Sequence, residues 1–447
     1  MDILTNDCQN GPHEDFKSKA HMNHESNMNS DSTNDISEHR AFLLSALERV
    51  EQGELATIVL NDAPLNAYSL CQEILLGCQR WNGSLEHIIR LNTRKNPKKG
   101  VRRILKLALY ELYFLKKPPH AVIDQAVRLC KQGKFKAQQK FVNAFLRQVE
   151  YPEGVYANQN FPDWLMDLWR QNGRWLKSLQ EHPKSGMVFV NPSSQEAYVD
   201  KYVDKIETQC TVDAEIVKGC FYSTQSGPIS QWKGYDDGEW WIMNPAAAYV
   251  VDRMFSHIEK SQPRVLDVCS APGGKAFRMA SLGATVTATD ISPSRIRRLL
   301  ENRDRLKMSS DRIDIIEQDC LISNPALGEY DGVFLDAPCS GLGVIRKHPE
   351  IRWNRSLEDV QTNAVLQKKL LQSASVYVSK AGVLAYCVCS LHPMEGQDVV
   401  DAFIEQNKEW KIIDIWKTPI DSKHIQVEKL DGFQLFVLKR SGGLNDK

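Results

Sequence analysis

Two cysteines late in the chain stand where covalent chemistry could be done. One lies in residues 335–340 (Leu-Asp-Ala-Pro-Cys-Ser) as Cys339, and the other lies in residues 386–390 (Tyr-Cys-Val-Cys-Ser) as Cys389. Each segment closes an apolar run typical of a buried strand, so each cysteine is expected on the loop that follows. Ligands of open α/β sheets bind beyond the carboxyl ends of the strands. Two thiols at that edge favour covalent chemistry on an electrophilic ring.

A third segment, residues 266–275 (Leu-Asp-Val-Cys-Ser-Ala-Pro-Gly-Gly-Lys), links a buried strand to a helix. Glycines at such a turn let backbone N–H groups approach a ligand, and the following helix N-terminus favours an anionic group. The turn is not the GxGxxG of nucleotide oxidoreductases, and no Walker-type lysine–serine pair follows it. It therefore favours a cofactor that carries a carboxylate rather than phosphates.

Acidic residues close the next two strands. Asp290 ends the strand after this loop, where an acid typically accepts hydrogen bonds from ribose hydroxyls. Asp319 ends the third strand, where an adenine amino group would lie. Either acid alone could be a strand-end cap, but their repetition favours a cofactor with ribose and adenine. Together with the carboxylate-binding turn, this predicts S-adenosylmethionine.

The cysteines indicate which acceptor would receive the methyl group. Cytosine C5 is a poor nucleophile, but a thiolate added at C6 breaks the aromaticity and makes C5 enamine-like. C5 can then take a methyl group from a sulfonium, and loss of the C5 proton expels the thiolate. The target base must be splayed out or unpaired to be reached.

Composition limits the classes of protein that need considering. The chain has 447 residues, 42% of them hydrophobic and 25% charged, which is typical of a soluble protein with two or three domains. No apolar run is long enough to span a membrane, and no signal peptide begins the chain. Eleven cysteines occur without CxxC pairs or His/Cys clusters. We therefore expect reduced thiols, a cytoplasmic location and no metal site.

The zero net charge conceals a strong asymmetry. Residues 1–39 hold eight acids and two lysines, whereas residues 88–147 hold sixteen Lys and Arg against two acids, Glu111 and Asp124. A solvated helical surface is the commoner meaning of such a run. Its density favours contact with a polyanion, because neutralising phosphates releases counterions. We expect that polyanion to be RNA.

The pattern along the chain predicts four segments. Residues 1–38 form an acidic disordered tail, and residues 39–150 form an all-α bundle with helices at 68–80, 84–91, 100–115, 119–132 and 136–149. Residues 155–237 form linker helices and a small α/β subdomain of RNA-recognition type, with a helix at 194–206. Residues 238–441 alternate strands and helices as a mostly parallel, doubly wound, Rossmann-like α/β sheet. The predicted strands are 264–269, 285–289, 313–317, 331–335, 383–389, 411–415 and 433–438.

These motifs resemble known families over about 400 residues. Residues 104–112, 118–127 and 140–147 resemble the NusB-type RNA-binding domain. Residues 269–275, 336–340 and 388–390 are similar to motifs of the RNA 5-methylcytosine methyltransferases of the Fmu/Sun/NOL/NSUN group, and residues 343–353 and 431–433 point to its RsmB type. The resemblance implies S-adenosylmethionine-dependent methylation of 16S ribosomal RNA. Separately, we expect the protein to be a monomer.

The resemblance also implies roles for individual residues. It makes Cys389 the nucleophile at C6, gives Cys339 a part in releasing the methylated RNA, and places Asp336 near both the cytosine and the methyl donor. Cys387 is expected to point away from Cys389 and to be structural. The residues implied to bind the cofactor are Cys269, Ser270, Ala271, Pro272, Gly273, Gly274, Lys275, Asp290, Asp319 and Asp336.

Some residues depart from the family pattern. Val388 replaces the usual threonine, residues 392–396 (His-Pro-Met-Glu-Gly) replace a Leu-Pro-Glu-Glu-Asn type sequence, and residues 243–246 (Met-Asn-Pro-Ala) replace a Gln-Asp-Ala-Ser type. These departures keep open a non-catalytic RNA-binding assembly factor. The same chemistry on transfer RNA is a second alternative, because contacts to phosphates position RNA without specifying bases.

Overall fold

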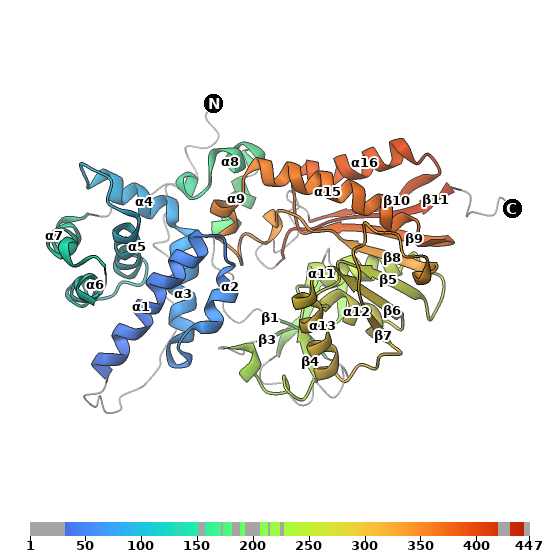
Figure 1. Cartoon of the computed structure of the whole chain (residues 1–447), viewed down its shortest axis with the longest axis horizontal. Coiled ribbons are helices and arrows are strands. Elements are labelled where there is room, and N and C mark those ends of the chain that lie inside the picture. Colours follow the sequence, from blue (N-terminus) through green and yellow to red (C-terminus); the bar gives the residue numbers. More distant parts are fainter. Residues whose placement is uncertain are drawn as a thin grey trace. The chain divides into compact units, whose positions relative to one another are not determined.

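The computed structural model divides the chain into two compact units (Figure 1). One comprises residues up to Gln180 together with His348–Asn354, and the other comprises Glu181–Lys347 and Arg355 onward. The structure describes residues 32–132, 134–150, 157–170, 173–180, 188–192, 206–212, 215–223, 228–418 and 430–441.

The first unit is helical, as the sequence predicted. The predicted helices at 68–80 and 119–132 have the observed bounds, and the others agree to within a few residues. A short helix at Ala56–Val59 was not predicted. The helices are α1 (Ser32–Glu51), α2 (Ala56–Val59), α3 (Tyr68–Arg80), α4 (Asn82–Leu91), α5 (Lys99–Tyr113), α6 (Pro119–Gln132), α7 (Gln139–Gln148), α8 (Asp163–Trp169) and α9 (Gly173–Gln180).

Apolar residues at helical spacing build the core of this bundle. Helix α5 contributes most to it, because Ile104, Leu105, Ala108 and Leu109 are each at most 1% exposed. A buried ion pair lies in the same bundle, with Arg40 Nη2 of α1 2.6 Å from Glu111 Oε1 of α5. Such a pair destabilises strongly if one partner is removed, since a buried charge then remains uncompensated.

A segment from much later in the chain completes the helical unit. Residues 348–354 include the short helix α14 (Ile351–Asn354). Arg352 is fully buried, and its guanidinium donates to the backbone carbonyls of Arg80, Asn160 and Leu179. These carbonyls close helical ends or turns, where backbone acceptors lack an intrahelical partner. The segment is therefore part of the core of the first unit.

The second unit contains a small antiparallel sheet and a larger mixed sheet. The small sheet has the order β2-β3-β1-β4. Its strands are β1 (Val188–Pro192), β2 (Ile206–Val212), β3 (Glu215–Ser223) and β4 (Trp240–Ile242). The helix predicted at 194–206 lies outside the described residues, except that Ile206 begins β2.

The larger sheet has seven strands in the order β10-β11-β9-β8-β5-β6-β7. The pairs from β9 to β7 are parallel, and β11 runs antiparallel to both β9 and β10. The predicted mostly parallel, doubly wound sheet is thus confirmed. Its strands are β5 (Arg264–Val268), β6 (Thr285–Asp290), β7 (Ile313–Glu317), β8 (Tyr330–Asp336), β9 (Val378–Val388), β10 (Trp410–Lys417) and β11 (Gln434–Arg440).

Helices cover both faces of this sheet (Figure 1). Alternate residues of each strand point to opposite faces, so Ala385 and Cys387 join the core under one set of helices while Leu384 and Tyr386 join the other. The helices are α11 (Pro245–Phe255), α12 (Gly274–Ser281) and α13 (Pro293–Arg305) on one side, and α15 (Leu357–Ser375) and α16 (Gln397–Gln406) on the other.

The N-terminal prediction needs one correction. Residues 1–31 lie outside the described residues, but 32–38, predicted to be disordered, belong to α1. The acidic composition therefore misled the prediction at this boundary.

Candidate active site

The two cysteine segments lie side by side at one edge of the large sheet. They follow β8 and β9, which are adjacent parallel strands, and the backbone N–H of Ala337 extends the ladder by donating to Cys387 O at 2.9 Å. Beyond the strands, Cys339 Sγ lies 3.3 Å from Cys389 Sγ. The backbone N–H of Gly343 donates to Cys389 O at 2.9 Å. The two thiols predicted to act together are thus in contact.

Their surroundings distinguish the cysteines. The pKa of the Cys339 thiol is raised well above its usual value, first by its hydrogen bond with Cys389 and then by burial. Burial likewise raises the pKa of Cys387, which is fully buried. Cys339 therefore stays a neutral thiol beside Cys389, and Cys387 is inert, since the thiolate is the reactive form.

The predicted orientation of Cys387 is wrong. Cys387 belongs to the core beneath α11 and α12, and Cys389 packs against the same cluster. Residues two apart along a strand share a face, so the two side chains are on the same side. Val388, between them, is fully buried in the opposite core. A valine at this position fills that core, and the hydroxyl of a threonine would be buried there.

The predicted cofactor loop links β5 to α12. Cys269 has a positive φ of 61° and Gly273 one of 105°. A Cβ on Gly273 would lie 2.2 Å from Leu299 Cδ1, so only glycine fits there, whereas a Cβ on Gly274 would meet nothing within 4 Å. The loop is therefore packed on its inner side and open at the start of the helix, where a ligand can approach backbone N–H groups.

The two strand-end acids differ in their surroundings. Asp290 is 1% exposed and accepts hydrogen bonds from the backbone N–H groups of Ala271 and Ser292. It therefore attaches the cofactor loop to the end of β6. Asp319 is partly exposed, and its carboxylate caps the backbone N–H of Leu321. The ribose and adenine contacts of these acids stay predictions.

Asp336 is paired with the lysine of the cofactor loop. Lys275 Nζ lies 2.6 Å from Asp336 Oδ2 and 5.4 Å from the centre of the Phe433 ring. Burial acts to lower the pKa of Lys275, but the charge of Asp336 and its hydrogen bond act to raise it, and the pKa is raised overall. Lys275 is therefore a permanent cation, and it lies within electrostatic reach of Cys389.

Sequence reasoning did not select two buried carboxylates near these loops. Asp267 of β5 is fully buried; its Oδ2 accepts from Ser270 Oγ, and its Oδ1 has no donor among the described residues. Burial raises its pKa to about 7. Glu395 is also fully buried and binds the loop after Cys339. Asp267 could have been found from the sequence, because it is a charged residue within the apolar run that predicts β5.

The departure at residues 243–246 preserves a helix start. Asn244 is the N-cap of α11, its side-chain oxygen accepts from the N–H of Ala246 at 2.9 Å, and Pro245 occupies the first turn. Asparagine at the N-cap and proline at the next position both favour helix initiation. The helix that precedes the cofactor strand therefore begins normally despite its different sequence.

The basic stretch of the helical unit is partly neutralised. Arg103 and Lys106 of α5 pair with Glu48, Glu51 and Glu86 from α1 and α4. Only the acids within residues 88–147 were counted from the sequence, so the unpaired positive charge of this stretch was overestimated. The side chains of Lys131, Lys136 and Lys140, in contrast, are exposed.

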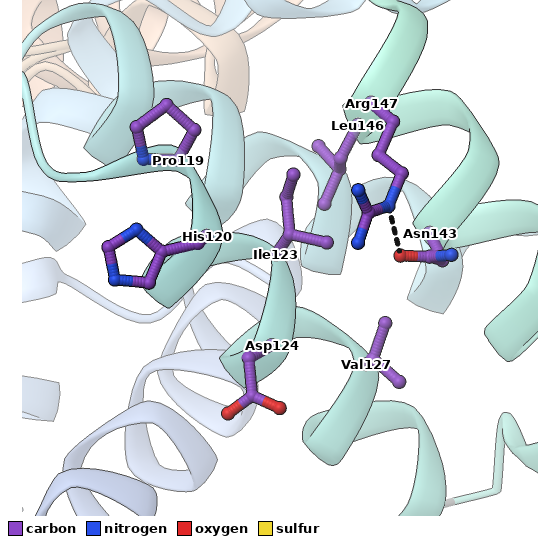
Figure 2. Close-up of a pocket in the computed structure, with 8 residues that line it drawn as sticks. All are labelled: Pro119, His120, Ile123, Asp124, Val127, Asn143, Leu146 and Arg147. Carbon is purple, nitrogen blue, oxygen red and sulfur yellow. Dashed lines mark hydrogen bonds between the residues drawn. The ribbon is translucent and has the colours of Figure 1, made fainter.

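A hollow of about 450 Å³ lies between α6 and α7 (Figure 2). Ile123, Val127 and Leu146 form its apolar part, and the Arg147 side chain donates to Asn143 Oδ1 at its rim. His120 lies at the other end of the same hollow. Two of the NusB-like sequence segments thus meet here.

The described residues hold neither a metal-binding cluster nor a membrane-spanning helix. No group of three or more His, Cys, Asp or Glu side chains that could hold a metal ion occurs among the described residues. Within the same part of the chain, no helix is long and apolar enough to cross a membrane.

Comparison with family models matches both predicted regions. Residues 257–437 match the model of the 16S rRNA methyltransferase RsmB/F, and residues 37–151 match the NusB family. The first match spans β5 to β11 with both cysteines and the cofactor loop. The second spans the helical bundle.

Curated relatives and solved structures agree with these matches. The chain is 28% identical over 408 residues to a probable ribosomal RNA small subunit methyltransferase B of Synechocystis sp., covering 83% of this chain and 89% of the relative. It is 27% identical over 426 residues to a ribosomal RNA small subunit methyltransferase B of Yersinia pestis, covering 90% and 97%. The crystal structure of PH0851 has a TM-score of 0.72 at 18% identity, covering 89% of this chain and 98% of that one. NSun6 from Pyrococcus horikoshii has a TM-score of 0.50 at 16% identity, covering 63% and 99%.

The fold and the site define a methyltransferase with a Rossmann-like sheet, preceded by a NusB-type helical domain. The chain belongs to the RsmB/F family of S-adenosylmethionine-dependent RNA methyltransferases.

Proposed function

We propose that this protein methylates C5 of a cytosine in 16S ribosomal RNA, with S-adenosylmethionine as the methyl donor. The observation that carries the proposal is the 3.3 Å contact between Cys339 Sγ and Cys389 Sγ at the carboxyl edge of β8 and β9. The family model and the relatives' names support the ribosomal substrate. The chemistry explains why two thiols are needed.

Cys389 is the nucleophile. Its thiolate adds to C6 of the cytosine and turns C5 into an enamine-like carbon that can accept a methyl group. Lys275 places a positive charge near this sulfur. Once C5 is methylated and has lost its proton to a base, the C6–S bond breaks and Cys389 leaves as a thiolate.

Cys339 assists the release step. Its raised pKa keeps the proton on its sulfur, and its Sγ is within hydrogen-bonding distance of Cys389 Sγ. The Cys339 thiol can therefore donate to the sulfur that departs from C6, which stabilises the leaving thiolate. A neutral thiol cannot compete as a nucleophile, so the two cysteines have different tasks.

The loop after β5 fits S-adenosylmethionine, which when bound supplies a methyl group on a positively charged sulfur. The open space beside Gly274 admits its carboxylate at the start of α12. The unpartnered Oδ1 of Asp267 can accept from its amino group. Asp290 accepts hydrogen bonds from the ribose hydroxyls, and Asp319 accepts one from the adenine amino group. The side chains of Ile291 and Ile322, close to these acids in the sequence, are 62% and 63% exposed and offer apolar surface to the adenine base. The residues from Cys269 to Lys275 form the rest of this site.

Asp336 orients the cytosine. Its carboxylate is 30% exposed although it is paired with Lys275, so it retains a face for a ligand. A carboxylate there can accept a hydrogen bond from the exocyclic amine of cytosine, which uracil lacks. The Lys275 ion pair fixes the direction in which that carboxylate points.

The helical unit contacts the RNA. Exposed Lys131 of α6, Lys140 of α7 and Lys136 in the turn between them provide cations, and the hollow between α6 and α7 provides an apolar recess. We further propose that the protein acts as a monomer in the cytoplasm, because all the residues assigned to chemistry come from one chain and its thiols need a reducing compartment.

Methyl transfer from tritiated S-adenosylmethionine to 16S RNA tests the proposal. Cys389→Ala should lose more than about a thousandfold of the rate and form no covalent complex with RNA containing 5-fluorocytosine. Cys339→Ala should still add to the base but release it slowly, so that a covalent complex accumulates even on unmodified RNA. Denaturing electrophoresis separates the covalent complex from free protein.

The alternatives give different results in the same assay. Full methylation by Cys389→Ala would remove the assigned roles. Labelling of transfer RNA but not 16S RNA would change the substrate. Binding of RNA without any methyl transfer by the wild-type chain would favour a non-catalytic assembly factor. Bisulfite sequencing of 16S RNA from cells with and without the gene then identifies the nucleotide.

A further inference from the structure

Glu395 joins the two cysteine loops through a buried hydrogen-bond network. It lies in the turn Pro393–Glu395, just before α16, and is fully buried. Its Oε1 accepts the backbone N–H of Ser340 at 2.7 Å, and its Oε2 accepts the Ser340 hydroxyl. Ser340 follows Cys339 directly, so both donors belong to the loop of the first cysteine. A carboxylate held by a backbone N–H and a hydroxyl fixes that loop more firmly than a neutral acceptor would.

The same network reaches the second cysteine loop. Ser340 Oγ lies 3.2 Å from Ser390 Oγ, and the Ser390 Oγ accepts the backbone N–H of His392 at 3.2 Å. Because the one hydroxyl hydrogen of Ser340 is used on Glu395, Ser390 must be the donor to Ser340. The hydrogen bonds therefore run in one direction, from His392 through both serines to Glu395.

Further bonds hold Glu395 itself in place. Tyr386 of β9 donates its hydroxyl to Glu395 O at 2.6 Å. Gln367 of α15 donates to Pro338 O at 2.8 Å and is 3.4 Å from Glu395 Oε1. Both serines are at most 1% exposed, so water does not compete with the network. Glu395 is therefore held from β9 through its backbone and from α15 through its carboxylate, and Gln367 also binds the Cys339 loop.

We infer that Glu395 is a positioning residue for the covalent step: by binding Ser340, and through it Ser390, it holds Cys339 Sγ against Cys389 Sγ. It touches neither substrate nor cofactor. The inference rests on the proposed function, because it assigns a task within that cysteine chemistry. Displacing either loop by about 1 Å would cost on the order of a hundredfold in rate, since reacting groups must be aligned.

Glu395→Gln is the first test, in the full chain. The amide keeps the size of the side chain but turns one acceptor oxygen into a donor, which cannot accept the Ser340 hydroxyl. We expect kcat to fall about a hundredfold while KM for RNA and the Kd for S-adenosylmethionine stay within about twofold. A purely structural role would instead lower the amount of folded protein and leave kcat per folded molecule unchanged.

Arg440→Met is the matched control. Arg440 donates to the backbone carbonyls of Ser375, Val378 and Ser379 at the opposite end of β9. Its loss also breaks hydrogen bonds that hold β9 and α15, but leaves the cysteine loops untouched. Glu395→Gln and Arg440→Met should both lower the melting temperature, and only Glu395→Gln should lower kcat. Equal kcat losses in the two variants would overturn the inference.

A double-mutant cycle tests the route through Ser340. If Glu395 acts by binding Ser340, the double variant Ser340→Ala with Glu395→Gln should lose little more kcat than the more impaired of the two single variants. Additive losses would show that Glu395 acts elsewhere. Glu395→Asp keeps the negative charge on a shorter side chain. Its kcat should therefore be higher than that of Glu395→Gln.

A readout that does not need RNA separates this inference from the proposed function. Diamide, an azo oxidant, takes the two thiol hydrogens of neighbouring cysteines, becomes a hydrazine and leaves a disulfide. Mass spectrometry of the peptides should show that the Cys339–Cys389 disulfide forms at least about tenfold more slowly in Glu395→Gln than in wild type, since proximity sets its rate. Equal rates would overturn the inference even if the enzyme methylates RNA. Slower disulfide formation in Glu395→Gln, together with a wild-type chain that fails to methylate RNA, would leave the positioning role intact and refute the proposed function.

Discussion

At the scale of single residues, the chemistry proposed at the carboxyl edge of β8 and β9 depends on which side chains carry a charge and which stay neutral. Cys339 is held as a thiol by Cys389 and by burial, whereas Lys275 remains charged because Asp336 is its partner. Asp267 is the third case, since burial raises its pKa to about 7 and, among the described residues, only Ser270 donates to its carboxyl group. A buried carboxyl of this kind makes the stability of the ligand-free protein depend on pH.

The sign of that dependence is fixed by the raised pKa. The folded state binds the Asp267 proton more tightly than the unfolded state, so its stabilising effect is complete below the unfolded pKa and is lost as the pH rises to about 7. Asp267→Asn cannot ionise, so its free energy of unfolding relative to wild type should grow by roughly 3 kcal/mol from pH 5 to pH 8. Urea unfolding without ligand measures this. Asp311→Asn, at an exposed position, should show no such growth, and a constant difference for Asp267→Asn would contradict the prediction.

At the scale of elements, the sequence predicted what depends on local periodicity. The helix at 119–132 and the strand at 313–317 have their predicted bounds, because apolar spacing and strand-end turns specify them locally. The cysteine pair could also be predicted, since the ends of adjacent parallel strands meet at one edge. The Glu395 network could not, because it depends on which loops approach each other. The pairing of Arg103 with Glu48 and Glu51 was missed for the same reason.

The elements α6 and α7 carry a prediction about RNA binding. Lys136→Glu with Lys140→Glu should lower affinity for 16S RNA and reduce the slope of log Kd against log salt by about two, roughly one per lost lysine. Filter binding at several salt concentrations measures the slope. Lys380→Glu with Lys408→Glu is the control, because these exposed lysines lie near the starting ends of β9 and β10, at the edge away from the cysteines. Equal slopes for both pairs would place the RNA contact elsewhere.

At the scale of the whole molecule, the order of the chain differs from the order of its units. The chain leaves the second unit after Lys347 and returns to it at Arg355. The segment between them, which begins at His348 shortly after Cys339, belongs to the helical unit. Glu350 and Arg352 are buried in that segment, and Ala56 N–H donates to Glu350 Oε1 at 3.0 Å. The helical unit thus includes a stretch of chain that starts shortly after Cys339. A helical domain cut at residue 180 would lack it.

Arg352 is the residue on which this arrangement depends. Burial, and then repulsion from Arg80, lowers its pKa well below the usual value, while its guanidinium binds three backbone carbonyls and lies 4.3 Å from the Phe161 ring centre. Arg352→Met would remove the donor to those carbonyls and the electrostatic attraction between the guanidinium and Glu350, so the helical unit should lose about 3 kcal/mol of unfolding free energy. Hydrogen exchange in the full chain should then rise at α3, α4 and α14 but not in β5 to β9. Lys368→Met, on the exposed face of α15, is the control and should change neither the unfolding free energy of the helical unit nor the hydrogen exchange of these elements. Unchanged protection of α3 and α4 in Arg352→Met would mean that the helical unit holds together without the inserted segment.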